Sequence, residues 1–285
     1  MGHRGELAFI GLGLALGDLS LRALKFLETC DEVYLEAYTS IIPGFSRERL
    51  EELIGRSVRV VTRRDLEDKN GRVLLSPALE GKRVALLVIG DPFMATTHIE
   101  LRIRAEKIGI RTRVFHAPSI FTAVIGATGL QPYKFGKTVT IVYPDEKYGY
   151  FPLTPYEVLR DNITRGLHTL FLLDLKVEEG RAMTINEALT LLLEMEAREK
   201  LDLISPNTLV VGLARISSEN SISKAAIIQE LLDKDFGPPP HTLVVPGQLH
   251  PLEEEALIVL CGASREVVAS WNEKLRRKLR NISRT

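Results

Sequence analysis

The sequence is poor in cysteine and in every motif built around a metal or an activated serine. Its 285 residues include only two cysteines, Cys30 and Cys261, and neither belongs to a CxxC pair. A disulfide framework and a zinc site of the usual spacing are therefore not expected. No His, Cys and carboxylate residues share metal-ligand spacing, and no GxSxG elbow or Walker loop occurs. We expect both cysteines to be small buried side chains, and we expect no metal.

The sequence also lacks net charge and long apolar runs. Its 37 basic residues are balanced by 37 acidic residues, so no overall field attracts nucleic acid or anionic lipid. No stretch approaches the ~18 apolar residues that a membrane-spanning helix needs. Residues 1–6 lead into a strand without the apolar core of a signal peptide. We therefore expect a cytoplasmic protein that binds neither nucleic acid nor a membrane.

What the sequence does contain is an ordinary globular composition, with 45% hydrophobic and 26% charged residues. Its length suits two domains better than one core. Before residue 116, strand-like runs alternate with helical runs, which predicts an α/β fold with a mostly parallel sheet. The charged segment 63–71 is expected to be exposed. The expected strands are 7–10, 33–38, 58–61, 84–89 and 112–115, and the expected helices are 20–28, 47–54 and 99–107.

A change of rhythm at His116-Ala117-Pro118-Ser119 places a domain boundary after His116. We expect an N-terminal α/β domain at 1–116 and a C-terminal α/β domain at 117–285. The segment 258–263 fits either a strand or a short buried helix. In the second domain the expected strands are 138–142, 169–175, 209–213 and 241–245, and the expected helices are 120–129, 156–166, 184–201 and the basic C-terminus 265–284.

The clearest sign of a ligand pocket is Gly90-Asp91-Pro92, directly after the apolar run 84–89. Open α/β sheets bind small molecules where the carboxyl ends of parallel strands meet helix N-termini. Asp91 at such an end can bind a ligand hydroxyl or ammonium group, or can cap the next helix. Thr97 and Glu100 have capping-box spacing for that helix. We expect His98 to be partly exposed in its first turn.

A glycine-rich turn, Gly11 to Asp18, follows the first expected strand. Its third glycine comes one residue later than in the dinucleotide fingerprint, and Glu36 lies roughly where an acid that binds ribose is sought. Two interpretations follow. The protein is a nicotinamide or flavin enzyme, or the glycines form a tight turn without a phosphate ligand.

Three prolines precede His241 in the segment Phe236-Gly237-Pro238-Pro239-Pro240. A preorganised loop lowers the entropy lost when the following residue is held in place. His241 is therefore either a ligand contact or a structural histidine. Arg215, at the end of an expected strand, meets either the substrate or an acidic neighbour.

Taken in order, several segments resemble the diphthine synthase family of S-adenosylmethionine-dependent methyltransferases, nearly from end to end. The GLGL and GDP motifs are shared with the wider tetrapyrrole methyltransferases, whereas ATTH, HAPSI and GLHTL are typical of the diphthine branch. The segments are Gly11-Leu12-Gly13-Leu14, Glu36-Ala37-Tyr38-Thr39-Ser40, Gly90 to His98, His116-Ala117-Pro118-Ser119-Ile120, Tyr133-Lys134-Phe135-Gly136-Lys137, Gly166-Leu167-His168-Thr169-Leu170 and Phe236 to His241.

This resemblance implies two α/β domains of the tetrapyrrole methylase (class III methyltransferase) type, with a ligand cleft between them, usually as a homodimer. It implies methyl transfer to the amine of a modified histidine on translation elongation factor 2, which yields diphthine for diphthamide biosynthesis and S-adenosylhomocysteine. The late third glycine also fits a family whose glycine loop does not bind pyrophosphate. The same chemistry on a tetrapyrrole, or a noncatalytic ligand-binding protein on this fold, are the alternatives.

The resemblance also assigns cofactor contacts residue by residue, while catalytic residues stay unknown. Apolar walls that hold the adenine and methionine chain, with a few orienting polar groups, are consistent with these residue types. We expect no dedicated strong base, because a neutral amine attacks and His241 or water accepts the proton. The basic tail 274–284 is expected to be a solvated helix. The cofactor contacts are Leu14, Asp91, Met94, Ser119, Ile120, Leu173, Ile216 and His241.

Overall fold

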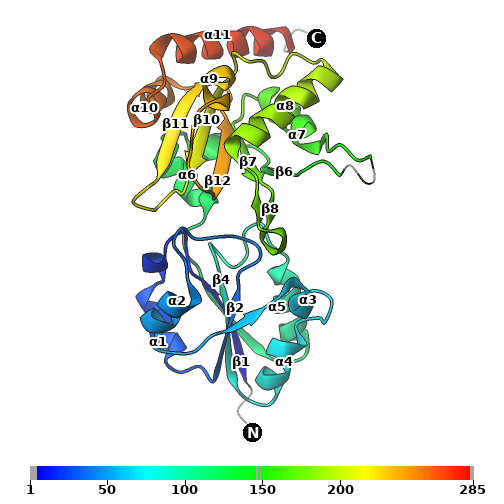
Figure 1. Ribbon diagram of the computed structural model, residues 1–285, viewed down its shortest axis with the longest axis vertical. Helices are drawn as coiled ribbons and strands as arrows, with labels where there is room; N and C mark the ends of the chain where they lie inside the picture. The colour runs from blue at the N-terminus through cyan, green and yellow to red at the C-terminus, as the bar shows by residue number, and fades with distance from the viewer. Residues whose placement is uncertain (1–4, 146, 148, 283–285) are drawn as a thin grey trace. The chain divides into compact units, whose positions relative to one another are not determined.

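The computed structural model describes residues 5–145, 147 and 149–282. The chain divides into two compact units, and each is an α/β assembly, as predicted (Figure 1). Unit 1 comprises Met1–Thr122 and Val177–Glu179, and unit 2 comprises Ala123–Lys176 and Gly180–Thr285. The division after Thr122 lies a few residues beyond the predicted boundary at His116.

The sheet of unit 1 is five-stranded, in the order β3-β2-β4-β1-β5, and every neighbouring pair is parallel. This is the mostly parallel sheet that the alternating runs predict. β1 and β4 are almost entirely buried apolar residues, as expected for central strands covered on both faces. The strands are β1 (Glu6–Gly11), β2 (Glu32–Glu36), β3 (Arg59–Val61), β4 (Arg83–Val88) and β5 (Arg111–Phe115).

Helices cover both faces of this sheet (Figure 1). Because side chains alternate along a strand, Ala8 and Ile10 of β1 pack with α1 and α2, while Leu7 and Phe9 pack with α4 and α5. The charged segment 63–71, expected only to be exposed, contains a short helix, and a second unpredicted helix follows it. The helices are η1 (Leu16–Asp18), α1 (Leu21–Leu27), α2 (Arg47–Ile54), α3 (Arg63–Leu66), α4 (Arg72–Leu79) and α5 (His98–Lys107).

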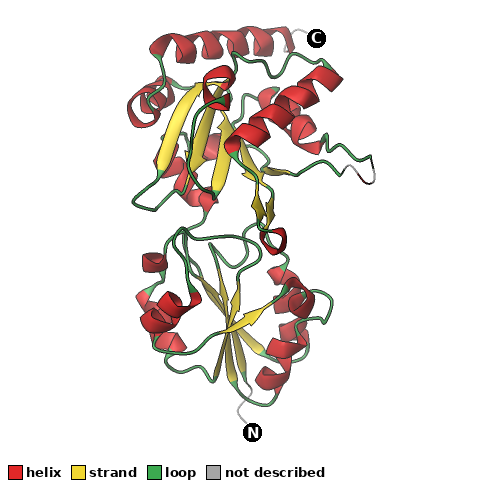
Figure 2. Ribbon diagram, in the orientation of Figure 1, coloured by secondary structure: helices red, strands yellow, loops and turns green. Residues whose placement is uncertain are grey.

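The sheet of unit 2 has the order β11-β10-β12-β7-β6 and is antiparallel except for the β6–β7 pair (Figure 2). A two-stranded ribbon of β8 and β9 accompanies it. The sequence did not predict β8, β9 or β11. The strands are β6 (Val139–Ile141), β7 (Thr169–Leu173), β8 (Leu175–Lys176), β9 (Arg181–Ala182), β10 (Leu209–Ala214), β11 (Ile222–Ile227) and β12 (His241–Val245).

The helices of unit 2 settle the ambiguous segment 258–263. Most of this segment belongs to α10. The helix starts at Pro251, with His250 as its N-cap residue, and it ends before Gly262, whose backbone is in the left-handed conformation with φ 61°. The end of the predicted helix 265–284 lies outside the described residues. Two helices do not belong to unit 2 alone: α6 (Ile120–Thr128) crosses the division between the units, and η4 (Val177–Glu179) is assigned to unit 1. The others are η2 (Pro132–Lys134), α7 (Thr154–Ile163), α8 (Ile185–Glu199), α9 (Ile228–Leu232), α10 (Pro251–Cys261) and α11 (Arg265–Ile282).

Both cysteines are free and buried, as predicted. Burial raises the pKa of each thiol to about 11, although nearby Arg56 partly opposes this for Cys30 and Lys224 does so for Cys261. The thiolate, which is the reactive form, is therefore scarce at neutral pH. Within the described part of the chain, no helix is both long and apolar enough to span a bilayer.

Candidate functional site

The carboxyl ends of β1 and β4 are joined by a pair of backbone hydrogen bonds between two glycines. The Gly90 amide donates to the Gly13 carbonyl at 2.8 Å, and the Gly13 amide donates back at 3.2 Å. Both residues have φ of 76°, a conformation that glycine adopts without the steric cost of a Cβ. The glycine turn and the GDP turn therefore form one continuous surface.

The loop after β5 joins the same surface through close packing at Gly11. A Cβ at Gly11 would lie 2.6 Å from the Gly90 carbonyl oxygen and 2.7 Å from the Ala117 Cβ. No side chain fits such a space, so glycine is required here. The three loops that follow β1, β4 and β5 are thereby in contact, as expected for strands whose carboxyl ends share one edge.

The amides of Leu12, Gly13, Leu14 and Ala15 in the glycine turn are already used within the protein. The Leu12 amide donates to the Val88 carbonyl at 2.8 Å. The Leu14 and Ala15 amides donate to the Asp18 carboxylate at 2.9 and 3.1 Å. A pyrophosphate needs free amides, and a carboxylate at this position repels it. The turn is therefore a self-capped structure and not a phosphate cradle.

Glu36, the other residue of the dinucleotide interpretation, is completely buried. Its carboxylate accepts hydrogen bonds from the amides of Tyr38 and Thr39 at 2.7 and 2.8 Å and from the Thr39 hydroxyl at 2.7 Å. These bonds hold the loop after β2. They use both oxygens of the Glu36 carboxylate, which is therefore not available to bind a ribose. Together with the occupied glycine turn, this contradicts the nicotinamide or flavin interpretation.

Asp91 lies at the junction of these loops and is only 9% exposed. One carboxylate oxygen accepts the Phe93 amide at 3.1 Å, and the other lies 2.7 Å from Nδ1 of His116, whose side chain is 73% exposed. Asp91 caps its own turn and not α5. Since a carboxylate can accept about four hydrogen bonds, two of its positions remain for a ligand. Sequence reasoning used His116 as a boundary marker and as part of a family-typical segment, and it missed this contact.

The start of α5 differs from the prediction in two respects. Thr97 is the N-cap residue, but its hydroxyl donates to Glu67 at 3.2 Å and does not cap the helix, so the capping box is absent. His98 is 2% exposed and not partly exposed. Its Nδ1 lies 3.1 Å from the Pro92 carbonyl, and its Nε2 is 3.7 Å from Glu36. Burial lowers the pKa of His98, although the nearby Glu36 opposes this shift.

Four of the five expected cofactor residues of unit 1 lie on the three loops in contact, and Ile120 is the first residue of α6. Leu14 follows β1, Asp91 and Met94 follow β4, and Ser119 and Ile120 follow β5. Asp91 and Ser119 are buried, Leu14 and Ile120 are half-buried, and the Met94 side chain is 46% exposed. This group thus combines an apolar wall with two polar side chains.

The three expected cofactor residues of unit 2 also lie together at one end of a sheet. β7 ends at Leu173, and β12 begins at His241. The antiparallel register pairs Leu172 with Thr242 and Ala214 with His241, which brings these strand ends side by side. Ile216 follows shortly after β10 on the same side.

His241 carries a hydrogen-bonding atom that is not used. Its Nδ1 accepts the Ile185 amide at 3.3 Å, while its buried Nε2 has no hydrogen-bond partner among the described residues. Burial lowers the pKa of His241, and the nearby Arg215 guanidinium lowers it further. The ring is therefore neutral, and because Nδ1 accepts, its single proton is on Nε2. His241 can donate one hydrogen bond to a ligand.

Arg215 pairs with no carboxylate among the residues that the structure describes, and it is shielded from solvent. It is 7% exposed and donates to the carbonyls of Phe236, at 2.6 Å, of Pro238, and of Asn220, at 3.0 Å. Its backbone amide also donates to Pro240 at 2.9 Å. Arg215 therefore anchors the proline-rich loop that presents His241. The predicted acidic neighbour is wrong, whereas the predicted substrate contact stays a prediction.

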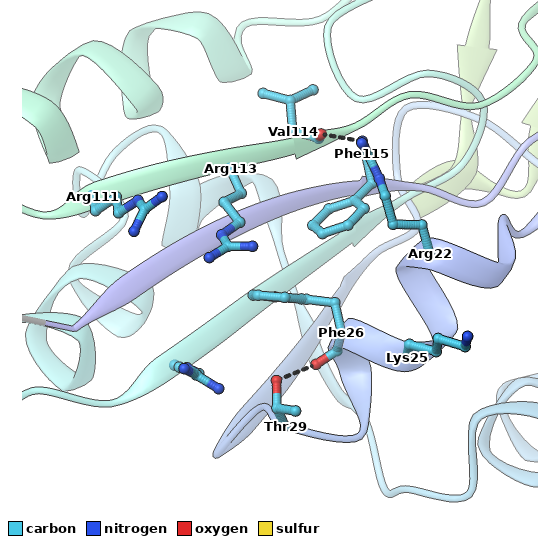
Figure 3. Close-up of a pocket in the computed structure, with 9 residues that line it drawn as sticks. Arg22, Lys25, Phe26, Thr29, Arg111, Arg113, Val114 and Phe115 are labelled. Atoms are coloured by element: carbon cyan, nitrogen blue, oxygen red, sulfur yellow. Dashed lines mark hydrogen bonds between the residues drawn. The ribbon is translucent and has the colours of Figure 1, made fainter.

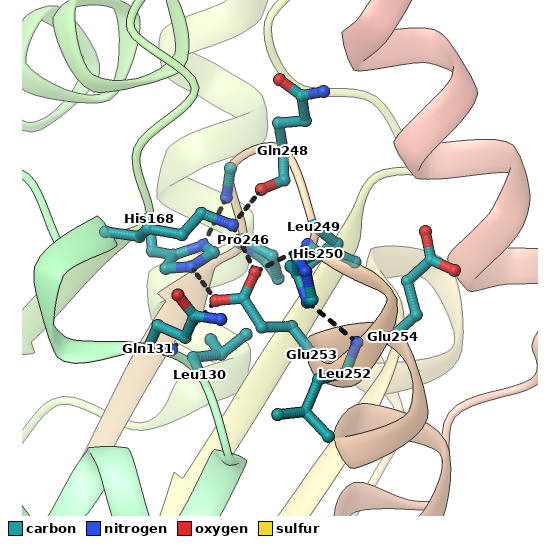
Figure 4. Close-up of polar contacts among 12 residues, drawn as sticks. Leu130, Gln131, His168, Pro246, Gln248, Leu249, His250, Leu252, Glu253 and Glu254 are labelled. Carbon is teal, nitrogen blue, oxygen red and sulfur yellow. Dashed lines mark hydrogen bonds and ion pairs between the residues drawn. The ribbon is translucent and has the colours of Figure 1, made fainter.

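Two residues of the family-typical segments, Lys134 and His168, converge on a buried carboxylate in unit 2. Figure 4 shows His168 beside this carboxylate, which belongs to Glu253. Glu253 accepts His168 Nε2 and the Gln131 amide, both at 2.9 Å, the His250 amide at 2.8 Å, and the Lys134 ammonium. Burial alone raises the pKa of Glu253, but these hydrogen bonds bring it well below its usual range. This network ties η2, the residue before β7 and α10 together and is structural.

No group of three or more His, Cys, Asp or Glu side chains in the described ranges is arranged to hold a metal ion. The tetrapyrrole (corrin/porphyrin) methylase family matches residues 6–231.

The comparisons with individual proteins cover nearly the whole chain. A diphthine synthase of Methanocaldococcus jannaschii is 45% identical over 258 residues, which span 90% of this chain and 98% of the relative. A diphthine synthase of Methanothermobacter thermautotrophicus is 46% identical over 265 residues, 92% of this chain and 98% of the relative. A crystal structure of diphthine synthase covers 93% of this chain and 99% of its own, with a TM-score of 0.83 and 36% identity.

Proposed function

Since this chain belongs to the tetrapyrrole methylase family and, within it, to the diphthine synthases, we propose that it methylates translation elongation factor 2. The acceptor is the amino group of the modified histidine precursor, and the product is diphthine, an intermediate of diphthamide biosynthesis. The observation that carries this proposal is the identity of 45% over nearly the full length of a diphthine synthase. A tetrapyrrole substrate is not favoured, because these relatives are named for diphthine.

We propose S-adenosylmethionine as the methyl donor, held by the residues that the resemblance assigns. When bound, it supplies an electrophilic methyl group on a sulfonium. The free acceptor positions of Asp91 suit the ribose hydroxyls or the ammonium of the amino-acid end. The unused Nε2 proton of His241 suits a hydrogen-bond acceptor on a ligand. Each unit also offers apolar side chains among the assigned residues: Leu14, Met94 and Ile120 in unit 1, and Leu173 and Ile216 in unit 2.

We propose that the protein has no dedicated strong base. A free α-amino group has a pKa of about 8, and desolvation favours its neutral, nucleophilic form. His241 suits proton acceptance poorly, because its Nδ1 already accepts the Ile185 amide and its Nε2 carries the proton. Water therefore accepts the proton, and the side chains contribute mainly by orienting donor and acceptor.

The proposal also includes a homodimer and a cytoplasmic location, where a translation factor is found. The test is transfer of a radiolabelled methyl group from S-adenosylmethionine to elongation factor 2 that carries the unmethylated histidine precursor. We expect label on the factor and none on a factor whose modified histidine is replaced. Label on a tetrapyrrole instead, or cofactor binding without transfer to any acceptor, contradicts the proposal.

A further inference from the structure

A groove of about 550 Å³ follows β5, the edge strand of the unit 1 sheet (Figure 3). Its walls come from α1, from the start of β4 and from β5. Five cationic side chains line it: Arg22, Lys25, Arg83, Arg111 and Arg113. The chain as a whole has no net charge, so this groove is a local concentration of positive charge.

Few acidic side chains neutralise this charge. Glu6 pairs with Arg113, and it lies 3.7 Å from Nε of Arg111. Arg22, Lys25 and Arg83 form no ion pair with any of the described residues, and all three are exposed. The groove therefore keeps a net positive charge that an anionic partner can neutralise.

Two of the arginines are held in place by aromatic rings. The Arg22 guanidinium lies 5.0 Å from the centre of the Phe115 ring, and that of Arg113 lies 5.4 Å from the centre of the Phe26 ring. The two rings pack against each other with centroids 4.9 Å apart. Stacking restrains a guanidinium while its N–H groups remain available for a carboxylate. The groove is thus partly preorganised for oxyanions.

The backbone of β5 is not prepared to pair with another strand. The Thr112 amide donates to Glu106 at 3.0 Å, and the Val114 carbonyl accepts Arg22 at 3.4 Å. On an edge strand, these two backbone groups would otherwise be free to hydrogen-bond to another strand. A partner in this groove is therefore held by side-chain charge and not by strand addition.

β5 also leads directly to the proposed cofactor residues. It ends at Phe115, and the next residue is His116, which contacts Asp91 at 2.7 Å. We propose that the groove docks an acidic segment of the protein substrate and so directs the factor toward the cofactor, an inference that rests on the proposed function. A nucleic acid is less favoured, because a phosphate backbone needs an extended basic surface, and this one is confined to a single groove of a neutral chain.

The test compares two double charge reversals in the full-length protein. The groove variant is Lys25→Glu with Arg111→Glu, and the control is Lys107→Glu with Arg64→Glu. Lys25 and Lys107 are exposed residues in the last turns of α1 and α5, so both variants change net charge equally and alter a helix end in the same way. Methyl transfer to unmethylated elongation factor 2 is measured against factor concentration at low and high salt, and cofactor affinity is measured by calorimetry.

We expect the groove variant to raise the KM for the factor by roughly tenfold at low salt, with kcat and cofactor affinity unchanged. The control variant should behave as the parent protein, and high salt should reduce the difference between them. An equal KM for the two variants overturns the inference. So does loss of binding to a labelled single-stranded RNA in the groove variant with no change in KM for the factor. Failure of the parent protein to methylate the factor overturns the proposed function instead.

Discussion

At the scale of single residues, the polar groups near the proposed cofactor site differ in how much hydrogen-bonding capacity they have left. Glu36 accepts three hydrogen bonds, from the Tyr38 amide and from the amide and hydroxyl of Thr39. Asp91 retains free acceptor positions, and His241 retains a free donor. Buried polar groups are normally paired, so the unused capacity separates residues that suit a ligand from residues that hold loops together.

Replacing Asp91 with alanine should weaken binding of S-adenosylmethionine at least about tenfold, because a hydrogen bond to a charged group contributes about 1.5–3 kcal/mol. His116→Ala should cause a smaller loss, since it removes only the partner that orients Asp91. Isothermal titration calorimetry measures both. Asp68→Ala, at an exposed aspartate of the same unit, is the control. Unchanged affinity in the Asp91 variant contradicts the assignment.

Two substitutions of His241 separate its ligand contact from its structural role. Asparagine can replace Nδ1 as acceptor for the Ile185 amide but loses the Nε2 donor, whereas glutamine can supply a donor near Nε2. We expect His241→Asn to lose about tenfold in cofactor affinity and His241→Gln to lose less. Calorimetry gives the affinities, and urea unfolding without cofactor gives the stability. If affinity follows stability in both variants, the histidine is only structural.

At the scale of elements, the glycine turn depends on Asp18 for its shape. Asp18→Ala removes the acceptor of the Leu14 and Ala15 amides and should lower the free energy of unfolding by about 1–2 kcal/mol. Asp18→Asn keeps one acceptor oxygen and should lose less than half as much. Urea denaturation provides the comparison. Equal stability of the alanine variant and the parent would show that the turn holds its shape without this cap.

The network around Glu253 predicts a larger effect on unit 2. In Glu253→Gln one acceptor oxygen becomes an amide donor that faces other donors, and Lys134 loses its counter-charge. Breaking a buried ion pair from one side costs about 3–5 kcal/mol, so we expect a loss of this size in urea unfolding. The control is Glu255→Gln, at an exposed position of α10 two residues after Glu253. A loss below about 1 kcal/mol would contradict the proposed structural role.

Element boundaries were predictable where local signals agree with burial. α2 has its predicted bounds because Ser46 caps its start and Gly55, with φ of 66°, ends it. α4 was missed because Pro77 opposes a helix, yet burial of its apolar residues outweighs that preference. β11 was missed because its sequence ISKAAI has neither β-branched richness nor alternation. In both cases tertiary packing overrides weak local preference.

At the scale of the whole molecule, three buried histidines predict how stability depends on pH. Burial is the largest cause of a lowered pKa in His98, His168 and His241. The unfolded chain therefore binds protons near pH 6.5 that the folded protein does not, and stability falls as the pH drops below that value. Glu253, whose folded pKa is lowered, adds a second loss below about pH 4.5. Urea unfolding at pH 7.5, 5.5 and 4 measures both steps. A free energy of unfolding that is constant or rises between pH 7.5 and 5.5 contradicts this account.

The sequence by itself determined the two α/β units, the parallel sheet of the first and the family, because these depend on hydrophobic periodicity and on motifs that are local in the chain. The tertiary structure alone decided which polar groups are occupied. Arg215 anchoring the proline loop and Glu253 binding His168 and Lys134 each pair groups that lie far apart in the sequence and that no pattern of spacing specifies. Hydrogen-bond satisfaction is a property of positions in space, so it appears only once the chain is folded.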